Sequence, residues 1–212
     1  YFGISLGAMM GPSLVALSYE ITAAVFAVGG GDLLKFALGN PTIVPLLPLL
    51  AQLAGSQGIL DRTILAGQAL LDAADPNTFA TRILKSRPIG VERTPNLLLL
   101  LSIFDQVVPP ANGHSVARAL NLPQVPPLFD PIELLSPSSQ TPIQGNLNSE
   151  TTVGVFQYDR VTSGEGVVPS NHDNTPYSPE ATLQVIEFFE SWRAQGVSRI
   201  IDPYEVLNTP PL

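Results

Sequence analysis

Gly3-Ile4-Ser5-Leu6-Gly7 matches the pattern G-x-S-x-G, which places a serine nucleophile on a sharp turn between a strand and a helix. Such a turn is strained, and we expect both glycines to relieve crowding where a Cβ atom would collide. The backbone N–H of the residue after the serine would then face a developing oxyanion. A five-residue pattern also arises by chance, in which case it marks a glycine-rich turn before a buried helix.

A serine nucleophile needs a base and an acid, and the sequence has two histidines. His172 lies in a loop that follows an expected strand, and Asp105 follows another expected strand directly. In an open α/β sheet both positions fall at the edge where sites form. The order Ser5, Asp105, His172 predicts a nucleophile, an orienting acid and a general base.

Each partner has an alternative interpretation. Asp105 could cap the helix near Val108, and His172 taken alone could be a surface histidine. His114 is the rival base, but it lies at the start of a short expected helix. Three further side chains could compete for these roles and fit them less well: Asp32 as a helix N-cap, Asp173 beside the histidine, and Ser13 within a helix without flanking glycines.

Four apolar stretches are expected to be strands: Tyr1–Ile4, Ile21–Val28, Asn96–Phe104 and Thr151–Tyr158. Ile21–Val28 is a continuous apolar run without alternation, as a parallel strand covered on both faces needs, and Asn96–Phe104 is a second buried-strand run. Helices are expected over Leu6–Ser18, from Gly113 or His114 to Leu120, and from Ser178 onward, with Pro12 kinking or restarting the first. This alternation predicts an α/β fold with a mostly parallel sheet and helices on both faces.

Residues 32–88 have helical spacing and are predicted to form a helical cap inserted into a core of residues 1–31 and 89–212. The segment Pro41–Leu60 contains no charged residue, and we expect a buried cap helix lying over the sheet. Its prolines, glycines and glutamines argue against a membrane-spanning helix. The alternative is a lid whose apolar underside meets acyl chains or a lipid interface.

Composition excludes several classes of function. The net charge of −8 and the absence of a basic stripe argue against nucleic acid as a partner. No cysteine is present, so disulfides and thiolate metal sites are excluded. A hydroxyl nucleophile with a histidine base needs no cofactor, and we expect none.

The stretches GISLGAMMG, FAVGGGD, DAADPNTFA and FDQVVPPANGHSVARAL, with the late loop histidine, resemble the C-terminal half of bacterial α/β-hydrolase lipases and esterases. The likeness is to the exported, virulence-factor-type lipase family. It implies hydrolysis of carboxylic esters by Ser5, Asp105 and His172, with the Leu6 N–H in the oxyanion hole. It also implies an extracytoplasmic location, and an N-terminal half that would supply the rest of the sheet and the second oxyanion donor.

Two other functions stay open at this point. A serine peptidase or amidase of the same fold would use the same three residues, because both reactions pass through a tetrahedral intermediate. A non-catalytic fragment that needs its N-terminal half is the third possibility, because an unpaired first strand would seek a partner. An apolar cap favours an acyl or other hydrophobic substrate.

Overall fold

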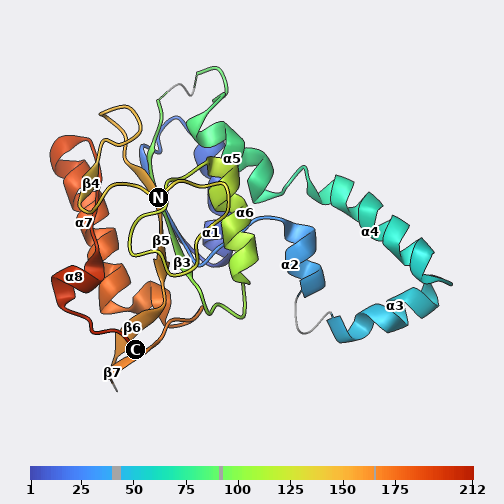
Figure 1. Ribbon diagram of the computed structural model, residues 1–212. Helices are drawn as coiled ribbons and strands as arrows, with labels where there is room; N and C mark the ends of the chain where they lie inside the picture. The colour runs from blue at the N-terminus through green and yellow to red at the C-terminus, as the bar shows by residue number, and fades with distance from the viewer. Residues whose placement is uncertain (40–43, 91–92, 165) are drawn as a thin grey trace.

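The computed structural model describes residues 1–39, 44–90, 93–164 and 166–212 and contains a four-stranded sheet (Figure 1). The strand order is β1-β2-β3-β5, and every neighbouring pair is parallel. The predicted fold class, α/β with a mostly parallel sheet, is confirmed. The strands of this sheet are β1 (Phe2–Ile4), β2 (Ala23–Ala27), β3 (Asn96–Ser102) and β5 (Val153–Tyr158).

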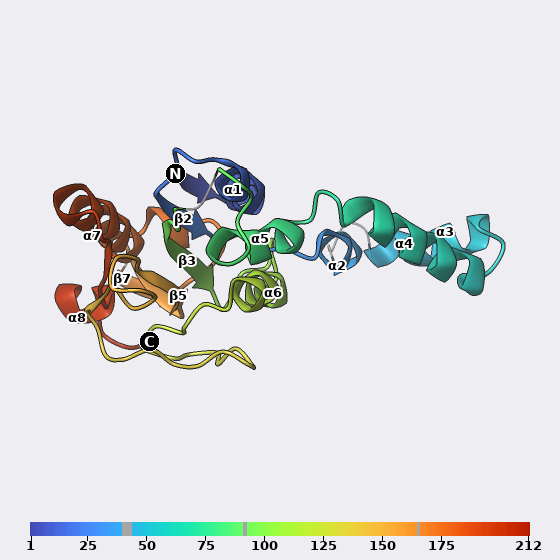
Figure 2. The same ribbon diagram turned by 90° about the horizontal axis from the view of Figure 1, so that it is seen from above.

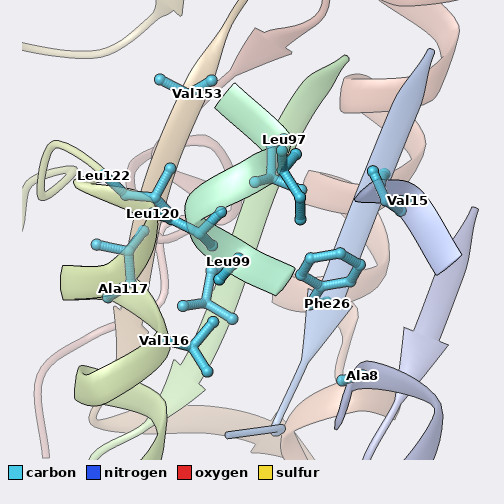
Figure 3. Packing of buried hydrophobic residues seen from close by; sticks show 14 of the residues in the cluster. Ala8, Val15, Phe26, Leu97, Leu99, Val116, Ala117, Leu120, Leu122 and Val153 are labelled. Carbon is cyan, nitrogen blue, oxygen red and sulfur yellow. The ribbon is translucent and has the colours of Figure 1, made fainter. Parts of the chain in front are cut away.

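Helices cover both faces of the sheet, as Figure 2 shows from above. On one face pack α1 (Leu6–Leu17), α5 (Pro76–Leu84) and α6 (Pro110–Leu120). On the other pack α7 (Pro179–Gln195) and α8 (Pro203–Leu207). Alternate strand residues supply the two cores: Phe26 and Leu99 point to the first (Figure 3), and Val25 and Leu98 to the second.

Local signals account for the helix boundaries. The Ser178 hydroxyl accepts a hydrogen bond from the Ala181 N–H, with Pro179 at the first position of α7, as expected. Helix α6 begins at Pro110, a few residues before the expected start. Helix α1 continues through Pro12 as one element, so the predicted restart is wrong.

The expected helical cap divides into two parts in the structure. Helix α5 belongs to the core, where Ala80 and Ile83 are fully buried between α1 and α6. The preceding elements form an arm that projects away from the sheet (Figures 1 and 2). The arm comprises α2 (Leu33–Gly39), the short 3₁₀ helix η1 (Val44–Leu46), α3 (Leu47–Leu53) and α4 (Gln57–Leu71).

The prediction of a buried cap helix within Pro41–Leu60 is wrong for the residues that the structure describes. Residues 41–43 lie outside the described residues. From Val44 to Ile59 no residue is buried, and Leu53 is 76% exposed. The main contacts of this segment are within the arm, where α3 packs against α4 as a helical hairpin (Figure 2). No single described helix is long and apolar enough to cross a membrane; α2 and Val44–Leu53 pass that test only as a bent pair.

A single carboxylate holds the two ends of the arm together. Asp75, buried at the N-cap of α5, accepts the Asn77 N–H at 2.9 Å and the Asp32 N–H at 3.0 Å through Oδ1. Its Oδ2 accepts the Leu33 N–H at 2.6 Å. The chain therefore leaves and rejoins the core at one buried group.

The stretch 159–176, which contains the loop of His172, includes an antiparallel hairpin. Its strands are β6 (Arg160–Ser163) and β7 (Gly166–Pro169), with Val161 opposite Val168. The C-terminal segment contains α8. Two short strands, β4 (Ile143–Gln144) and β8 (Arg199–Ile200), pair antiparallel. The 3₁₀ helix η2 (Thr175–Tyr177) leads into α7.

The two edges of the main sheet differ. The edge of β5 is covered by the loop at Pro123–Val125, because the Val155 N–H donates to the Pro123 carbonyl and the Val125 N–H donates to the Val155 carbonyl. Strand β1 has β2 as its one strand partner among the described residues. Its edge is therefore available to a further strand.

Candidate active site

Ser5 occupies a strained turn at the carboxyl end of β1. Its φ of 53° and ψ of −116° lie outside the usual regions for a residue with a side chain. The surroundings fix this conformation: the Ser5 N–H donates to the Ala27 carbonyl at 2.9 Å, and its carbonyl accepts from the Met9 N–H at 3.0 Å. Strain held in place by the sheet and the helix is typical of functional positions.

The two flanking glycines play different parts in this turn. A Cβ atom on Gly3 would lie 2.6 Å from both the carbonyl carbon and oxygen of Gly7, which are backbone atoms that cannot move aside. A Cβ on Gly7 would meet only the Tyr1 hydroxyl, at 3.8 Å, which is an ordinary contact. The expectation that both glycines relieve crowding is therefore correct for Gly3 and wrong for Gly7.

Gly3→Ala is expected to destabilise the protein markedly, and Gly7→Ala is the matched control. Overpacking against groups that can shift costs about 1–3 kcal/mol, and the fixed backbone at Gly3 places the cost at or above the top of that range. Gly7→Ala should change the free energy of unfolding by less than about 1 kcal/mol. Urea denaturation followed by circular dichroism measures both. Equal stability of the two variants would contradict the assigned crowding.

The three predicted site residues are joined by hydrogen bonds. His172 Nε2 lies 2.8 Å from the Ser5 hydroxyl oxygen, and His172 Nδ1 lies 2.8 Å from Asp105 Oδ2. An ionised carboxylate can only accept, so Nδ1 carries the proton and donates it to Asp105. Nε2 is then free to accept the hydrogen bond from Ser5, which is the tautomer a general base needs.

Asp105 is held in this orientation by the backbone that follows β3. Its Oδ1 accepts the N–H groups of Val107 and Val108, each at 2.8 Å, and the residue is 6% exposed. The alternative interpretation of Asp105 as a helix cap is wrong, because α6 begins at Pro110 and the two N–H groups belong to the turn before it. One oxygen binds this turn while the other faces His172. Both carboxylate oxygens of a buried anion are satisfied.

The buried hydroxyl groups of Ser102 and Ser170 connect the loop that carries Asp105 to the loop that carries His172. The Ser170 hydroxyl donates to the Tyr158 carbonyl at 2.6 Å, which leaves its oxygen to accept from Ser102 at 2.8 Å. Ser102 ends β3 and also accepts the Phe104 N–H at 3.3 Å. These contacts fix the positions from which Asp105 and His172 extend. Sequence reasoning missed both serines, because a serine near a strand end carries no distinctive signal.

Ser170→Ala is expected to lower kcat about tenfold or more while changing KM less than twofold. The substitution removes the hydroxyl pair that supports the Asp105–His172 hydrogen bond between the two loops, and small displacements of catalytic groups are costly; a shift of 1 Å can cost about 100-fold. Steady-state kinetics on a soluble ester, the substrate class that the sequence predicts, tests this, with the partly exposed Ser138→Ala as the control. A variant that is less stable but keeps its kcat would contradict the positioning role.

The rival residues have other partners. His114 Nε2 lies 3.3 Å from Gln157 Nε2 and 3.6 Å from Asp130 Oδ2. Burial lowers the pKa of His114, with the Asp130 carboxylate opposing that shift and Arg118 adding to it. Three other candidates also lie outside the hydrogen-bonded chain: the Asp32 carboxylate caps α2 at the Lys35 N–H, the Asp173 N–H donates to Asn171, and the Ser13 hydroxyl donates to the Met10 carbonyl.

The Leu6 N–H stands at the start of α1, where the first amides have no carbonyl four residues back in the helix. The helix dipole adds a partial positive charge at this end. This amide adjoins Ser5 and is able to receive negative charge on a substrate oxygen. Among the described residues, no group of three or more histidine, aspartate or glutamate side chains could hold a metal ion.

Two hollows border these residues. One, of about 380 Å³, lies between α1 and the root of the arm, which is the junction near Leu33 and Ala74 where the arm leaves and rejoins the core. Its lining includes Leu6, Met9, Met10, Leu33, Ala74 and Phe79. The second, of about 300 Å³, is lined by His172 and its neighbours. A larger hollow of about 460 Å³ lies beside Asn96, at the amino-terminal end of β3 and therefore away from the site.

The chain matches no protein-family model and no curated protein sequence. Solved structures resemble it at low identity. Two structures of an acylaminoacyl peptidase from Pyrococcus horikoshii are 12% and 13% identical, with TM-scores of 0.48 and 0.49 over 92% and 97% of this chain. TT1662 from Thermus thermophilus is 19% identical, with a TM-score of 0.41 over 90% of this chain.

These likenesses cover only part of the other proteins. The chain spans 23% and 26% of the two peptidase chains and 52% of the Thermus protein. Likeness of this degree does not extend to activity. The fold class rests instead on the parallel sheet order and on the helices of both faces.

Proposed function

We propose that the protein is a serine hydrolase that cleaves carboxylic esters through an acyl-enzyme. The observation that carries this proposal is the unbroken hydrogen-bonded chain from Asp105 through His172 to Ser5, with the serine on a strained turn. The resemblance to bacterial lipases and esterases supports the same chemistry. An extracytoplasmic location belongs to this proposal and rests on that resemblance alone.

The geometry performs the reaction in two halves. The Ser5 oxygen attacks the ester carbonyl while its proton passes to His172 Nε2, and the carbonyl oxygen becomes an anion beside the Leu6 N–H. The intermediate collapses, the ester C–O bond breaks, and His172 returns the proton to the leaving alcohol. Water then attacks the acyl-serine, loses its proton to His172, and releases the acid and free Ser5. Asp105 stabilises the imidazolium in both halves.

Amide hydrolysis is the second candidate, because an amide would react at the same three residues. The similar structures from Pyrococcus horikoshii are named acylaminoacyl peptidase, which is an activity on amide bonds. The apolar hollow beside Leu6 and the resemblance favour an ester. A panel of p-nitrophenyl esters and aminoacyl p-nitroanilides separates the two: turnover of amides without turnover of esters would refute the ester proposal.

A fluorophosphonate probe tests the proposal directly, because it reacts only with an activated serine. We expect stoichiometric labelling, mapped by mass spectrometry to the peptide that contains Ser5. Ser5→Ala should abolish labelling, and Ser138→Ala should retain it. Labelling that survives in Ser5→Ala would show that the nucleophile is elsewhere, and absence of labelling in the unaltered chain would refute the hydrolase proposal for this chain.

We also propose that the open edge of β1 pairs with a further strand, such as one from an N-terminal half of the same protein. The uncovered edge supports this, as do the exposed side chains of Leu14 and Leu17 on the adjoining helix. Light scattering combined with fluorophosphonate labelling tests whether the segment is required. A stable monomer labelled at Ser5 would refute the view that the chain is a non-catalytic fragment.

The exposed tip of the arm is proposed as a contact with a lipid interface. From Val44 to Leu60 it carries no charge, while the whole chain has a net charge of −8. Attraction to anionic headgroups is therefore not expected, and binding should depend on apolar contact alone. Co-sedimentation with phosphatidylcholine vesicles should be insensitive to salt and should be lost in Leu49→Glu/Leu53→Glu. Retention of binding in that variant would contradict the proposal.

A further inference from the structure

The hollow beside the serine is an apolar groove between two parts of the molecule. One side is α1, which contributes Leu6, Met9 and Met10. The other side is the root of the arm with the start of α5, which contributes Leu33, Ala74 and Phe79. At about 380 Å³ it falls within the usual size range of small-molecule sites, roughly 300–1,000 Å³. Because Leu6 follows Ser5, one end of the groove adjoins the nucleophile.

The chemistry of this groove is suited to hydrocarbon. None of its lining residues is charged. Its one lining hydroxyl, on Ser13, donates to the Met10 carbonyl of its own helix and is thus already engaged. The burial of methylene groups against such a surface is favourable by about 0.8 kcal/mol each.

The hollow beside His172 has a different character. It is lined by His172 itself and by Gln106, Asn171 and Asp173, beside Phe104 and Val107. Amide and carboxylate groups there can hydrogen-bond to hydroxyls of a ligand. The two hollows thus differ in polarity, and each adjoins a different member of the catalytic chain.

The direction of proton transfer decides which part of an ester lies in which hollow. His172 must give its proton to the leaving alcohol, so the alcohol must lie on the His172 side. The carbonyl oxygen must face the Leu6 N–H, so the acyl substituent must take a direction that is neither that of this N–H nor that of His172. The uncharged groove lined by Leu6 is the hollow whose chemistry suits it. We propose that the groove between α1 and the arm root holds the acyl chain and that the hollow beside His172 holds a polar alcohol. This inference rests on the proposed ester hydrolysis.

This assignment makes the root of the arm a determinant of acyl-chain selectivity. Leu33 and Ala74, where the arm leaves and rejoins the core, face the groove from opposite ends of the arm sequence. The buried Asp75 carboxylate fixes both, through the Leu33 N–H and through its own place next to Ala74. The substrate class is therefore an ester of an apolar acyl group with a polar alcohol, and Ala74 limits the space available to the chain.

Ala74→Phe tests the acyl side. Ala73 and Ala74 at the arm root are both exposed, so a larger side chain at position 74 fills the groove without entering the core. We expect the ratio of kcat/KM for p-nitrophenyl octanoate to that for the acetate to fall at least tenfold. Ala66→Phe, on an exposed position of α4 away from the groove, is the matched control and should leave the ratio within twofold.

The alcohol side is tested by Gln106→Leu, which should reduce the preference for a glycerol ester over the ethyl ester of the same acid at least threefold. Labelling of Ser5 by a small fluorophosphonate distinguishes a failure of the groove assignment from a failure of the proposed hydrolase function. If Ser5 is labelled in every variant but the octanoate ratio is unchanged in Ala74→Phe, the groove assignment is wrong. If Ser5 is not labelled in the unaltered chain, the proposed hydrolase function itself fails.

Discussion

His172→Ala is expected to lower ester turnover by about 10⁶-fold, the scale on which loss of a single triad base acts in serine hydrolysis. The reason is geometric. His172 Nε2 is the group within 2.8 Å of the Ser5 hydroxyl, so its removal leaves no acceptor for the proton when the oxygen attacks. Fluorophosphonate labelling should slow in parallel, because the probe needs the same activation.

The second histidine of the chain is the matched control. His114→Ala removes a half-buried ring beside Gln157 and Asp130 and should keep kcat within about threefold. Stopped or end-point assays with p-nitrophenyl butyrate give both values, and thermal unfolding shows whether each variant is folded. A folded His172→Ala enzyme with more than a thousandth of the original kcat would refute the assignment of the base.

Asp105→Asn is expected to lower kcat by about 10⁴-fold with little change in fold. The amide oxygen of asparagine can still accept the N–H groups of Val107 and Val108, as the carboxylate does. Its NH₂ group then faces His172 Nδ1 and donates to it. Nδ1 becomes the acceptor, the proton moves to Nε2, and the ring can no longer take the proton of Ser5.

The measurement is the pH dependence of kcat together with the unfolding free energy. The lost activity of Asp105→Asn should not be recovered at any pH at which the protein is folded, since the ring is held in the wrong tautomer. Asp173→Asn, on the exposed residue next to the histidine, removes a charge but keeps a side chain that can hydrogen-bond to an alcohol, so it should retain nearly full kcat. Similar losses in both variants would mean that general loop charge, and not the Asp105–His172 hydrogen bond, is responsible.

The sequence was sufficient to nominate the three side chains that the structure brings together. Ser5 could be found because its flanking glycines form a recognisable pattern, and His172 because the chain has so few histidines. Their catalytic roles stay predictions until the variants are measured. Ser102 and Ser170 could not be found, because their contact depends on the relative placement of two loops that no local pattern encodes.

The sheet was predictable for a different reason. An uninterrupted run such as Asn96–Ser102 needs apolar cover on both faces, and a parallel strand provides that. The hairpin of β6 and β7 was missed because its polar residues masked the Val161 and Val168 pair. Helix α8 could have been found, since Asp202 followed by Pro203 repeats the N-cap signal of Ser178 and Pro179.

The arm shows the limit of composition. A segment without charge is compatible with a buried helix, but burial requires a partner surface, and composition does not reveal whether one exists. Among the described residues, α3 packs mainly against α4 and η1, and its leucines at positions 49, 50 and 53 remain exposed. The distribution of apolar residues in a single segment therefore predicts its affinity for apolar surroundings and not its place in the fold.

The Asp75 clamp has a consequence for how such an enzyme can diversify. The chain leaves the core and returns to it at one buried carboxylate, so the roughly forty residues between form a closed loop. The entropic cost of closing such a loop during folding rises only slowly with its length. An arm of another length or composition could be exchanged at this junction without disturbing the strands that carry Ser5, Asp105 and His172. Under the proposed function, selectivity and chemistry would thus be encoded in separable segments, and mutation could change one while the other is retained.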